Sequence, residues 1–293
     1  MPIAKSIYDK RRRPLDAVTH ILIYFCASIS ILLLAGIVGY VAFRGISSIS
    51  WSFLTTVPST IKGTFGIAGN IVNTLYIIII TLLIAIPFGV GSAIYLNEYA
   101  KPGKIVRLIE FTTETLAGIP SIIFGLFGYV FFGNTLKLGY SILTGSFTLV
   151  LMILPLITRN TQEALKTVPS SYRSGALGIG ATKWYMIRTI LLPSAMPGII
   201  TGIILSIGRI VGESAALLFT AGSGYLLPKF GNYGEGLVEK VLQPGGTLTI
   251  QLFLSMEKAE YQDAFGIAFI LLVIVFCINL LTKYLSRKFN VNK

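Results

Sequence analysis

The sequence predicts an all-α integral membrane protein with six transmembrane helices. Three observations support this prediction: 54% of the 293 residues are hydrophobic and 12% charged, long apolar stretches recur along the chain, and basic residues gather at their ends. A soluble fold of this size has too little polar surface to cover so many apolar side chains, whereas a bilayer removes that requirement.

Six segments approach the roughly 20 apolar residues that a spanning helix needs. They cover residues 20–43, 70–96, 115–132, 142–158, 196–220 and 264–281. The fourth has the weakest signal, because it is short and contains Gly145, Ser146 and Pro155. The first resembles a cleavable signal peptide, but its apolar run exceeds the roughly 7–15 residues of such a segment, so we interpret it as a retained span.

Lysine and arginine are distributed unevenly between the two sides of the predicted membrane. Of the 24 basic residues, 17 flank one side, 6 flank the other, and Arg209 lies within a span. Because cytoplasmic loops carry an excess of Lys and Arg, we expect both termini in the cytoplasm of a multi-pass protein of the plasma (inner) membrane. The net charge of +12 is then a topology signal, and no nucleic-acid partner is expected.

This topology divides the chain into a cytoplasmic segment, a first helix, an external loop, a core and a tail. Their predicted bounds are 1–19, 20–43, 44–69, 70–281 and 282–293. The core holds five spans, a cytoplasmic loop at 159–195 and an external loop at 221–263.

The sequence offers little for covalent chemistry. His20 is the only histidine, and the two cysteines, Cys26 and Cys277, lie in apolar stretches. The chain also lacks the Gly-x-x-x-x-Gly-Lys-Ser/Thr loop that holds nucleotides. We therefore predict that the chain is not an enzyme and has no cofactor or metal of its own.

Small and polar residues form a predicted stripe along the fifth span. Its members are Gly202, Ser206, Arg209, Glu213, Ala216 and Thr220, spaced by three or four residues. A charge at the bilayer centre costs about 2.5–3.5 kcal/mol, so Arg209 and Glu213 are functional candidates. They are either a structural ion pair in a seam helped by Gly208 and Gly212, or a site where Arg209 attracts an anion and Glu213 neutralises it between cycles.

The loop between the fourth and fifth spans carries a recognisable pattern. Residues 174–184 read Ser-Gly-Ala-Leu-Gly-Ile-Gly-Ala-Thr-Lys-Trp, followed by Leu-Pro at 192–193. This run resembles the EAA loop of ABC importer permeases, with Gly180 at the motif's glycine and Ser174 and Gly175 in place of Glu-Ala. The resemblance implies a helix that docks on a separate ATPase through Arg173, Ser174, Gly175, Ala176, Leu177 and Gly180. The physical alternative is an ordinary interfacial loop.

Three further segments, 116–128, 208–221 and 244–250, are similar to the phosphate-specific permeases of the A type (PstA family). The resemblance covers roughly residues 70–281 and implies a type I ABC importer permease architecture. It places Arg209, Glu213, Ser206, Pro120 and Ser121 on a translocation pathway. Asn70, Asn73 and Thr74 either line an entrance or pack the outer end of the second span.

The implied assembly contains a homologous second permease subunit, ATPase subunits that bind ATP and Mg, an external phosphate-binding protein and membrane lipid. The predicted function is ATP-driven import of inorganic phosphate. Two alternatives remain open: a permease for another oxyanion such as molybdate or sulfate, and a membrane scaffold or sensor.

Overall fold

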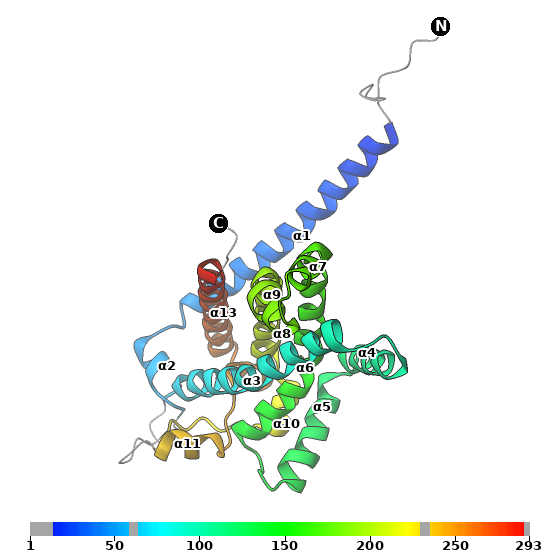
Figure 1. Ribbon diagram of the computed structural model, residues 1–293. Helices are drawn as coiled ribbons and strands as arrows, with labels where there is room; N and C mark the ends of the chain where they lie inside the picture. Colours follow the sequence, from blue (N-terminus) through cyan, green and yellow to red (C-terminus); the bar gives the residue numbers. More distant parts are fainter. Residues whose placement is uncertain (1–13, 59–63, 229–234, 290–293) are drawn as a thin grey trace.

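The computed structural model describes residues 14–58, 64–228 and 235–289, and these are mostly helical (Figure 1). The helices are α1 (Pro14–Ile46), α2 (Trp51–Thr55), α3 (Ala68–Ile94), α4 (Lys104–Ala117), α5 (Ser121–Gly128), α6 (Ile142–Lys166), α7 (Ser170–Gly178), α8 (Lys183–Met186), α9 (Leu192–Gly212), α10 (Ala215–Thr220), α11 (Glu235–Val241), α12 (Leu248–Glu257) and α13 (Tyr261–Phe289). The π-helical turns η1 (Tyr95–Tyr99) and η2 (Tyr129–Thr135) extend α3 and α5, and η3 (Ile187–Leu191) joins α8 to α9. The all-α prediction is confirmed.

Within the described ranges, five helices are long and apolar enough to cross a membrane, and the count rises to six if one bent helix pair is a single broken span. The five are Val18–Ile46, Ala68–Tyr99, Ile142–Lys166, Lys183–Gly212 and Tyr261–Tyr284. They match the predicted first, second, fourth, fifth and sixth spans, although the fifth ends earlier than expected.

The predicted third span, 115–132, is wrong as a single helix. α4 ends at Ala117, α5 begins at Ser121, and the segments Lys104–Ala117 and Ser121–Thr135 meet at 102°. Pro120 explains the break, because proline lacks a backbone N–H and disfavours a helical conformation in the residue before it. Pro120 therefore separates two helices where the sequence predicted one continuous span.

The core of the fold is built around α6, which packs against both α3 and α9. Of its apolar window 67% is buried, against 0% for α1, so α6 is the central span. Buried side chains of the main cluster come from α3, α5, α6, α9, α10 and α12, among them Ile77, Phe124, Leu149, Ile210, Leu217 and Ile250.

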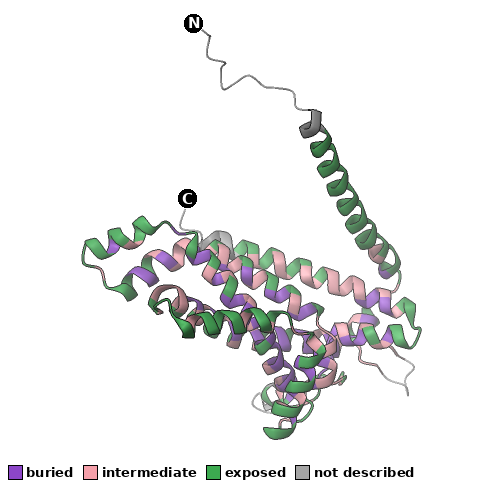
Figure 2. Ribbon diagram, turned by 90° about the vertical axis from the view of Figure 1, so that its right-hand side faces the viewer, coloured by how far each residue is buried: buried purple, intermediate pink, exposed green. Residues whose placement is uncertain are grey.

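α1 lies against the body only near its C-terminal end (Figure 2). There Tyr40 meets Phe265 of α13 edge to face at 5.6 Å, and Gly45 allows the helix to approach Phe265 and Phe269 closely. From Val18 onward, the apolar side chains along the rest of α1 are exposed, which is the arrangement expected of a helix that contacts lipid.

The predicted external loop, 221–263, holds two helices. One of them, α12, packs against α13 and α3, and its Leu248, Ile250 and Ser255 are buried. This segment is therefore part of the body of the protein, and its external location stays a prediction.

The α5–α10 contact predicts the effect of one added methyl group. At Gly125 a Cβ would lie 2.8 Å from the Cα of Ala216, whereas Gly91 of α3 has open space around it. Gly125→Ala is expected to cost about 1–3 kcal/mol through overpacking, and Gly91→Ala to gain up to about 1 kcal/mol of helix propensity. Thermal unfolding of the purified protein in detergent measures both, and equal midpoints for the two variants would contradict this packing.

Candidate functional site

The fifth span is broken at the position of its acidic residue. α9 ends at Gly212, Glu213 has an extended backbone with φ −83° and ψ 122°, and α10 begins at Ala215. A carboxylate oxygen of Glu213 accepts a hydrogen bond from the backbone N–H of Ala216 at 3.0 Å, which satisfies a free donor in the first turn of α10. The predicted continuous stripe is therefore wrong beyond Gly212, because Glu213 caps a new helix.

Arg209 lies one turn before the break, is half-buried, and makes no hydrogen bond or ion pair with another described residue. Ion pairs within the described ranges join Arg159 to Glu114 and Glu163, and Arg173 to Glu98. The pairing expected between Arg209 and Glu213 is thus not formed, because the change in backbone direction at Glu213 turns its carboxylate toward α10.

The ends of the predicted stripe pack against other helices. Ser206 is fully buried and its hydroxyl donates to the carbonyl of Gly202 at 2.9 Å. Gly202 itself faces Asn160 of α6, where a Cβ would lie 2.6 Å from the Asn160 Cβ. Beyond the break, the Thr220 hydroxyl donates to the carbonyl of Ala216 at 2.7 Å. Of the polar stripe residues, only the middle two, Arg209 and Glu213, are partly exposed.

α12 supports the break from outside the span. The hydroxyl of Thr249 lies 3.1 Å from the carbonyl oxygen of Val211 and 3.2 Å from that of Glu213, so its single O–H is shared between these two acceptors at the point where the helical hydrogen bonds are interrupted. Backbone groups without partners are costly in a bilayer, so a side-chain donor at this place stabilises the broken span.

The segment leading into α12 is held in turn by α3. The side-chain amides of Asn70 and Asn73 donate to the carbonyl of Gly246 at 3.0 and 3.2 Å, and Asn73 also reaches the carbonyl of Gly224 at 2.9 Å. Thr74 accepts from the backbone N–H of Leu248 at 3.0 Å. All three side chains are buried, so the packing interpretation is correct and they do not line an open entrance.

Segments from α5, α10 and α12 enclose a cavity of about 270 Å³ beside the break. Its lining residues are Ile122, Ser214, Ala215, Leu218, Phe219, Ile250 and Phe253. Ser121 precedes Ile122 at the start of α5 and is half-buried, whereas Pro120 is exposed. Because Ile122 and Ser214 line the same cavity, the beginning of α5 lies beside the broken fifth span.

The predicted docking residues, on α7 and in the turn after it, fall into two groups: some are exposed to solvent, and the others point toward the membrane spans. Ser174, Gly175, Leu177 and Gly180 are exposed, and Gly180, in the turn just after α7, has φ +84°, a conformation that glycine adopts easily. Ala176 is 4% exposed and packs into a cluster with α6 and α9 residues. The Arg173 side chain also turns inward, toward Glu98 at the end of α3.

Residues 85–291 match the family described as Binding-protein-dependent transport system inner membrane component. The chain belongs to this family. It is therefore a membrane subunit of an ABC importer, and the family resemblance predicted from the sequence is confirmed.

Relatives of this permease extend over most of its length. It is 35% identical to the probable ABC transporter permease protein YqgI of Bacillus subtilis over 268 residues, which cover 89% of this chain and 91% of the relative. It is 32% identical to the phosphate transport system permease protein PstA of Xylella fastidiosa, over 81% of this chain and 80% of the relative. A bacterial alginate ABC transporter, solved with an alginate-bound periplasmic protein, shares the fold with a TM-score of 0.65 at 16% identity, over 94% of this chain and 95% of that chain.

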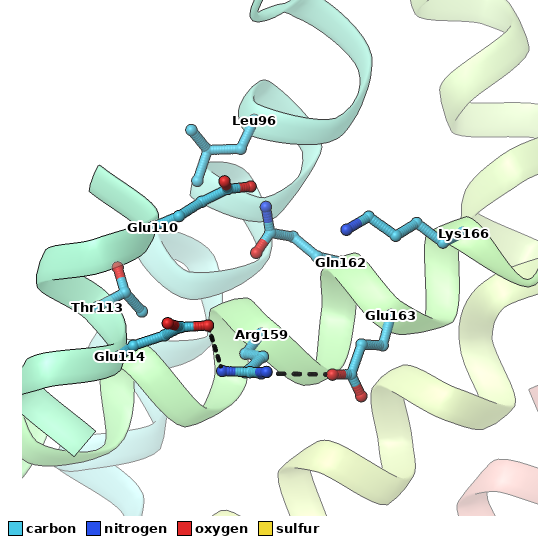
Figure 3. A pocket seen from close by; sticks show the side chains of 8 residues that line it. All are labelled: Leu96, Glu110, Thr113, Glu114, Arg159, Gln162, Glu163 and Lys166. Atoms are coloured by element: carbon cyan, nitrogen blue, oxygen red, sulfur yellow. Dashed lines mark hydrogen bonds and ion pairs between the residues drawn. The ribbon is translucent and has the colours of Figure 1, made fainter. Parts of the chain in front are cut away.

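A polar pocket of about 230 Å³, separate from the apolar cavity beside the break, lies between α4, α6 and the end of α3 (Figure 3). Its charged residues are Glu110, Glu114, Arg159, Glu163 and Lys166. Arg159 pairs with Glu114 at 2.9 Å and with Glu163 at 3.4 Å, and these side chains are more than half exposed. Exposed ion pairs contribute at most about 1 kcal/mol, so this cluster ties α4 to α6 only weakly.

Reading the sequence missed Thr249 and Glu98 as positioning residues. Thr249 lies in the segment 244–250 that carried part of the family resemblance, but nothing in its spacing links it to a helix break 36 residues earlier. Glu98 follows the second span directly, on the side rich in basic residues. A carboxylate among so many basic residues is the one sequence signal that could have suggested an ion pair with a specific arginine or lysine.

The support from Thr249 predicts how the break responds to its loss. Thr249→Val keeps the shape of the side chain but removes the donor to Val211 and Glu213. Losing one or two kcal/mol of local stability should raise amide hydrogen exchange across residues 211–216 by about 5–30-fold. Thr249→Ser retains the hydroxyl and should exchange like the unchanged protein; equally fast exchange in both variants would show that the hydroxyl does not support the break.

Proposed function

We propose that this permease imports inorganic phosphate, forming half of the translocation pathway and coupling to a separate ATPase that supplies the energy. The observation that carries the proposal is the Arg209 guanidinium, which stands in a membrane span without a partner among the described residues. Relatives named as phosphate permeases support the same substrate.

The chemistry of Arg209 suits an oxyanion. A guanidinium presents planar N–H donors that match two oxygens of a phosphate, and it stays charged at every physiological pH. An unpaired charge in a membrane is costly unless water or a counter-ion reaches it, which favours a position on an open pathway. Glu213, one turn further on, is held by Ala216 and so leaves the arginine available to an anion.

The second permease subunit is proposed to cover the open face of α9. Gly208 and Gly212 are exposed, and a Cβ at either position would meet nothing within 4 Å. Two glycines one turn apart allow the helix of a partner subunit to approach closely. The pathway would then run between the two subunits, with Arg209, Ser121 and the cavity beside Ser214 along it.

The other partners follow from the two ends of the molecule. The exposed side of α7, with Ser174, Gly175 and Leu177, is proposed to dock on the ATPase in the cytoplasm, together with the turn at Gly180. An external phosphate-binding protein would deliver the ion at the opposite side of the plasma membrane, and both termini would be cytoplasmic. ATP and Mg would be bound by the ATPase, and this chain would hold no cofactor.

Substitution of Arg209 tests the proposed function. Membrane vesicles carrying this permease with its second subunit, ATPase and binding protein should accumulate radiolabelled phosphate in the presence of ATP. Arg209→Ala should reduce the uptake at least about tenfold, the effect of losing one charged hydrogen-bonding group. Arg209→Lys keeps the charge but loses the paired N–H donors of the guanidinium, and it should retain part of the uptake. Arg107→Ala, at an exposed position of α4, serves as the control.

Competition with other anions separates the remaining possibilities. Uptake that arsenate inhibits more strongly than sulfate or molybdate supports phosphate as the substrate. Uptake of sulfate or molybdate in its place would make this an importer of another oxyanion. An assembled complex that imports none of these ions, with Arg209→Ala behaving like the unchanged protein, would favour a scaffold or sensor.

A further inference from the structure

Arg173 is the one residue of α7 whose side chain forms hydrogen bonds with other elements among the described residues. Its Nη2 lies 2.8 Å from the Oε1 of Glu98, and its Nε is 3.2 and 3.3 Å from the two carboxylate oxygens. The same guanidinium donates to the backbone carbonyls of Leu165 at 2.9 Å and Val168 at 3.0 Å. One side chain therefore connects α7 with the end of α3 and the end of α6.

This ion pair is protected from water, unlike the exposed pair on α4. The side chains of Glu98 and Arg173 are 5% and 23% exposed, against 60% and 58% for Glu114 and Arg159. Water and salt screen an exposed pair and leave it loose, whereas a largely buried pair in which all three guanidinium nitrogens donate hydrogen bonds holds a fixed geometry. The Glu98–Arg173 pair is thus a rigid connection.

Besides the Arg173 bonds, α7 is held mainly by packing against α8 and η3 at the start of the fifth span. Ala176 is the buried residue of α7, and a methyl group offers only a small apolar contact. The Ser174 hydroxyl bonds within α7 itself, to the carbonyls of Ser170 and Ser171. Among the described residues, the Arg173 side chain therefore supplies the side-chain hydrogen bonds that join α7 to the ends of α3 and α6.

We propose that the Glu98–Arg173 ion pair is the joint through which movement of α7 reaches α3 and α6. The inference rests on the proposed function, in which α7 docks on the ATPase. Arg173 was expected among the docking residues; as a positioning residue, it instead passes the displacement of the docked helix to the spans. The two exposed neighbours Ser174 and Leu177 remain on the docking side.

The receiving element is η1, the π-helical turn that ends α3. Glu98 lies in this turn, and the Asn97 amide donates to its carboxylate at 2.7 Å, which fixes the orientation of the acceptor. The neighbouring Tyr99 ring lies under the Lys183 ammonium at 4.9 Å, so α8 also contacts η1. π-Helical turns have irregular hydrogen bonding and often occur at functional sites, which suits a segment that must adjust when α7 moves.

Arginine is required for this joint because of its geometry. The guanidinium supplies five N–H donors in a plane, enough for the carboxylate and both carbonyls at once. A lysine would keep the charge, but its single nitrogen cannot contact all three acceptors in their separate directions. Arg173→Lys should therefore weaken the ion pair by removing donors, and Glu98→Gln should weaken it by removing the negative charge of the acceptor.

The experiment uses the complete transporter in proteoliposomes: this permease, its second subunit, the ATPase and the binding protein loaded with its own substrate. Three quantities are measured for each variant, namely ATPase bound per permease, ATPase stimulation by the binding protein, and substrate imported per ATP hydrolysed. Glu114→Gln, which breaks the exposed ion pair with Arg159, is the matched control for Glu98→Gln.

Glu98→Gln and Arg173→Lys are expected to keep the ATPase bound but to lower its stimulation and the import per ATP by about tenfold, a usual factor for coupling between two sites. Glu114→Gln should leave all three quantities unchanged. Normal stimulation and import in both joint variants would overturn the proposal, and so would loss of the bound ATPase in both, which would make the pair a tie for assembly.

The outcome is separable from the substrate assignment. If the unchanged transporter hydrolyses ATP under control of the binding protein but imports no phosphate, the phosphate proposal fails while the stimulation still tests the joint. If the unchanged permease binds no ATPase, docking through α7 fails and the inference fails with it.

Discussion

The structure depends on how a helix can be broken inside a membrane without leaving its backbone groups unpaired. At Glu213 the fifth span leaves its helical path, and a bilayer offers no water to replace the lost hydrogen bonds. The Glu213 carboxylate supplies an acceptor on one side of the break, and the Thr249 hydroxyl supplies a donor on the other. Because Thr249 belongs to α12, this helix must fold into the body beside the broken span.

The same constraint explains why the polar residues at the start of α3 are buried. α12 keeps its place because the asparagine amides of α3 hold the Gly246 carbonyl and Thr74 holds the Leu248 amide. A connected set of hydrogen bonds thus runs from α3 through the 246–249 segment to the break. Arg209, one turn away, is left without a protein partner in the described structure, and the proposed role in anion passage follows from this arrangement.

The sequence predicted the fold class, the approximate spans and the family well, because apolar stretches and motif residues are local signals. It underestimated the fourth span, α6, which is the most buried one. Gly145, Ser146 and Pro155 lowered its apolar signal, yet the Ser146 hydroxyl donates to the carbonyl four residues earlier at 2.8 Å, as does that of Thr148. A helix surrounded by protein tolerates such residues, whereas only a lipid-facing helix such as α1 must be uniformly apolar.

The members of the candidate site remain a prediction from the sequence, and the geometry expected for them was partly wrong. Helical spacing placed Arg209 and Glu213 on one face, but spacing assumes that the helix continues, and the break removes that assumption. The inward direction of Arg173 was hidden for a related reason, since its partner Glu98 lies 75 residues earlier in the chain. Contacts over such separations depend on packing that a single sequence does not encode locally.

The most direct measurement of the central claim is water access at the break. Ser214→Cys, in a chain with Cys26 and Cys277 replaced by serine, would be treated with a membrane-impermeant thiol reagent in the assembled transporter. If the broken span lines the pathway, the thiol should react, its rate should change when ATP is added, and the transported ion should slow the reaction. A thiol that stays unreactive from both sides of the membrane, with and without ATP, would contradict the account.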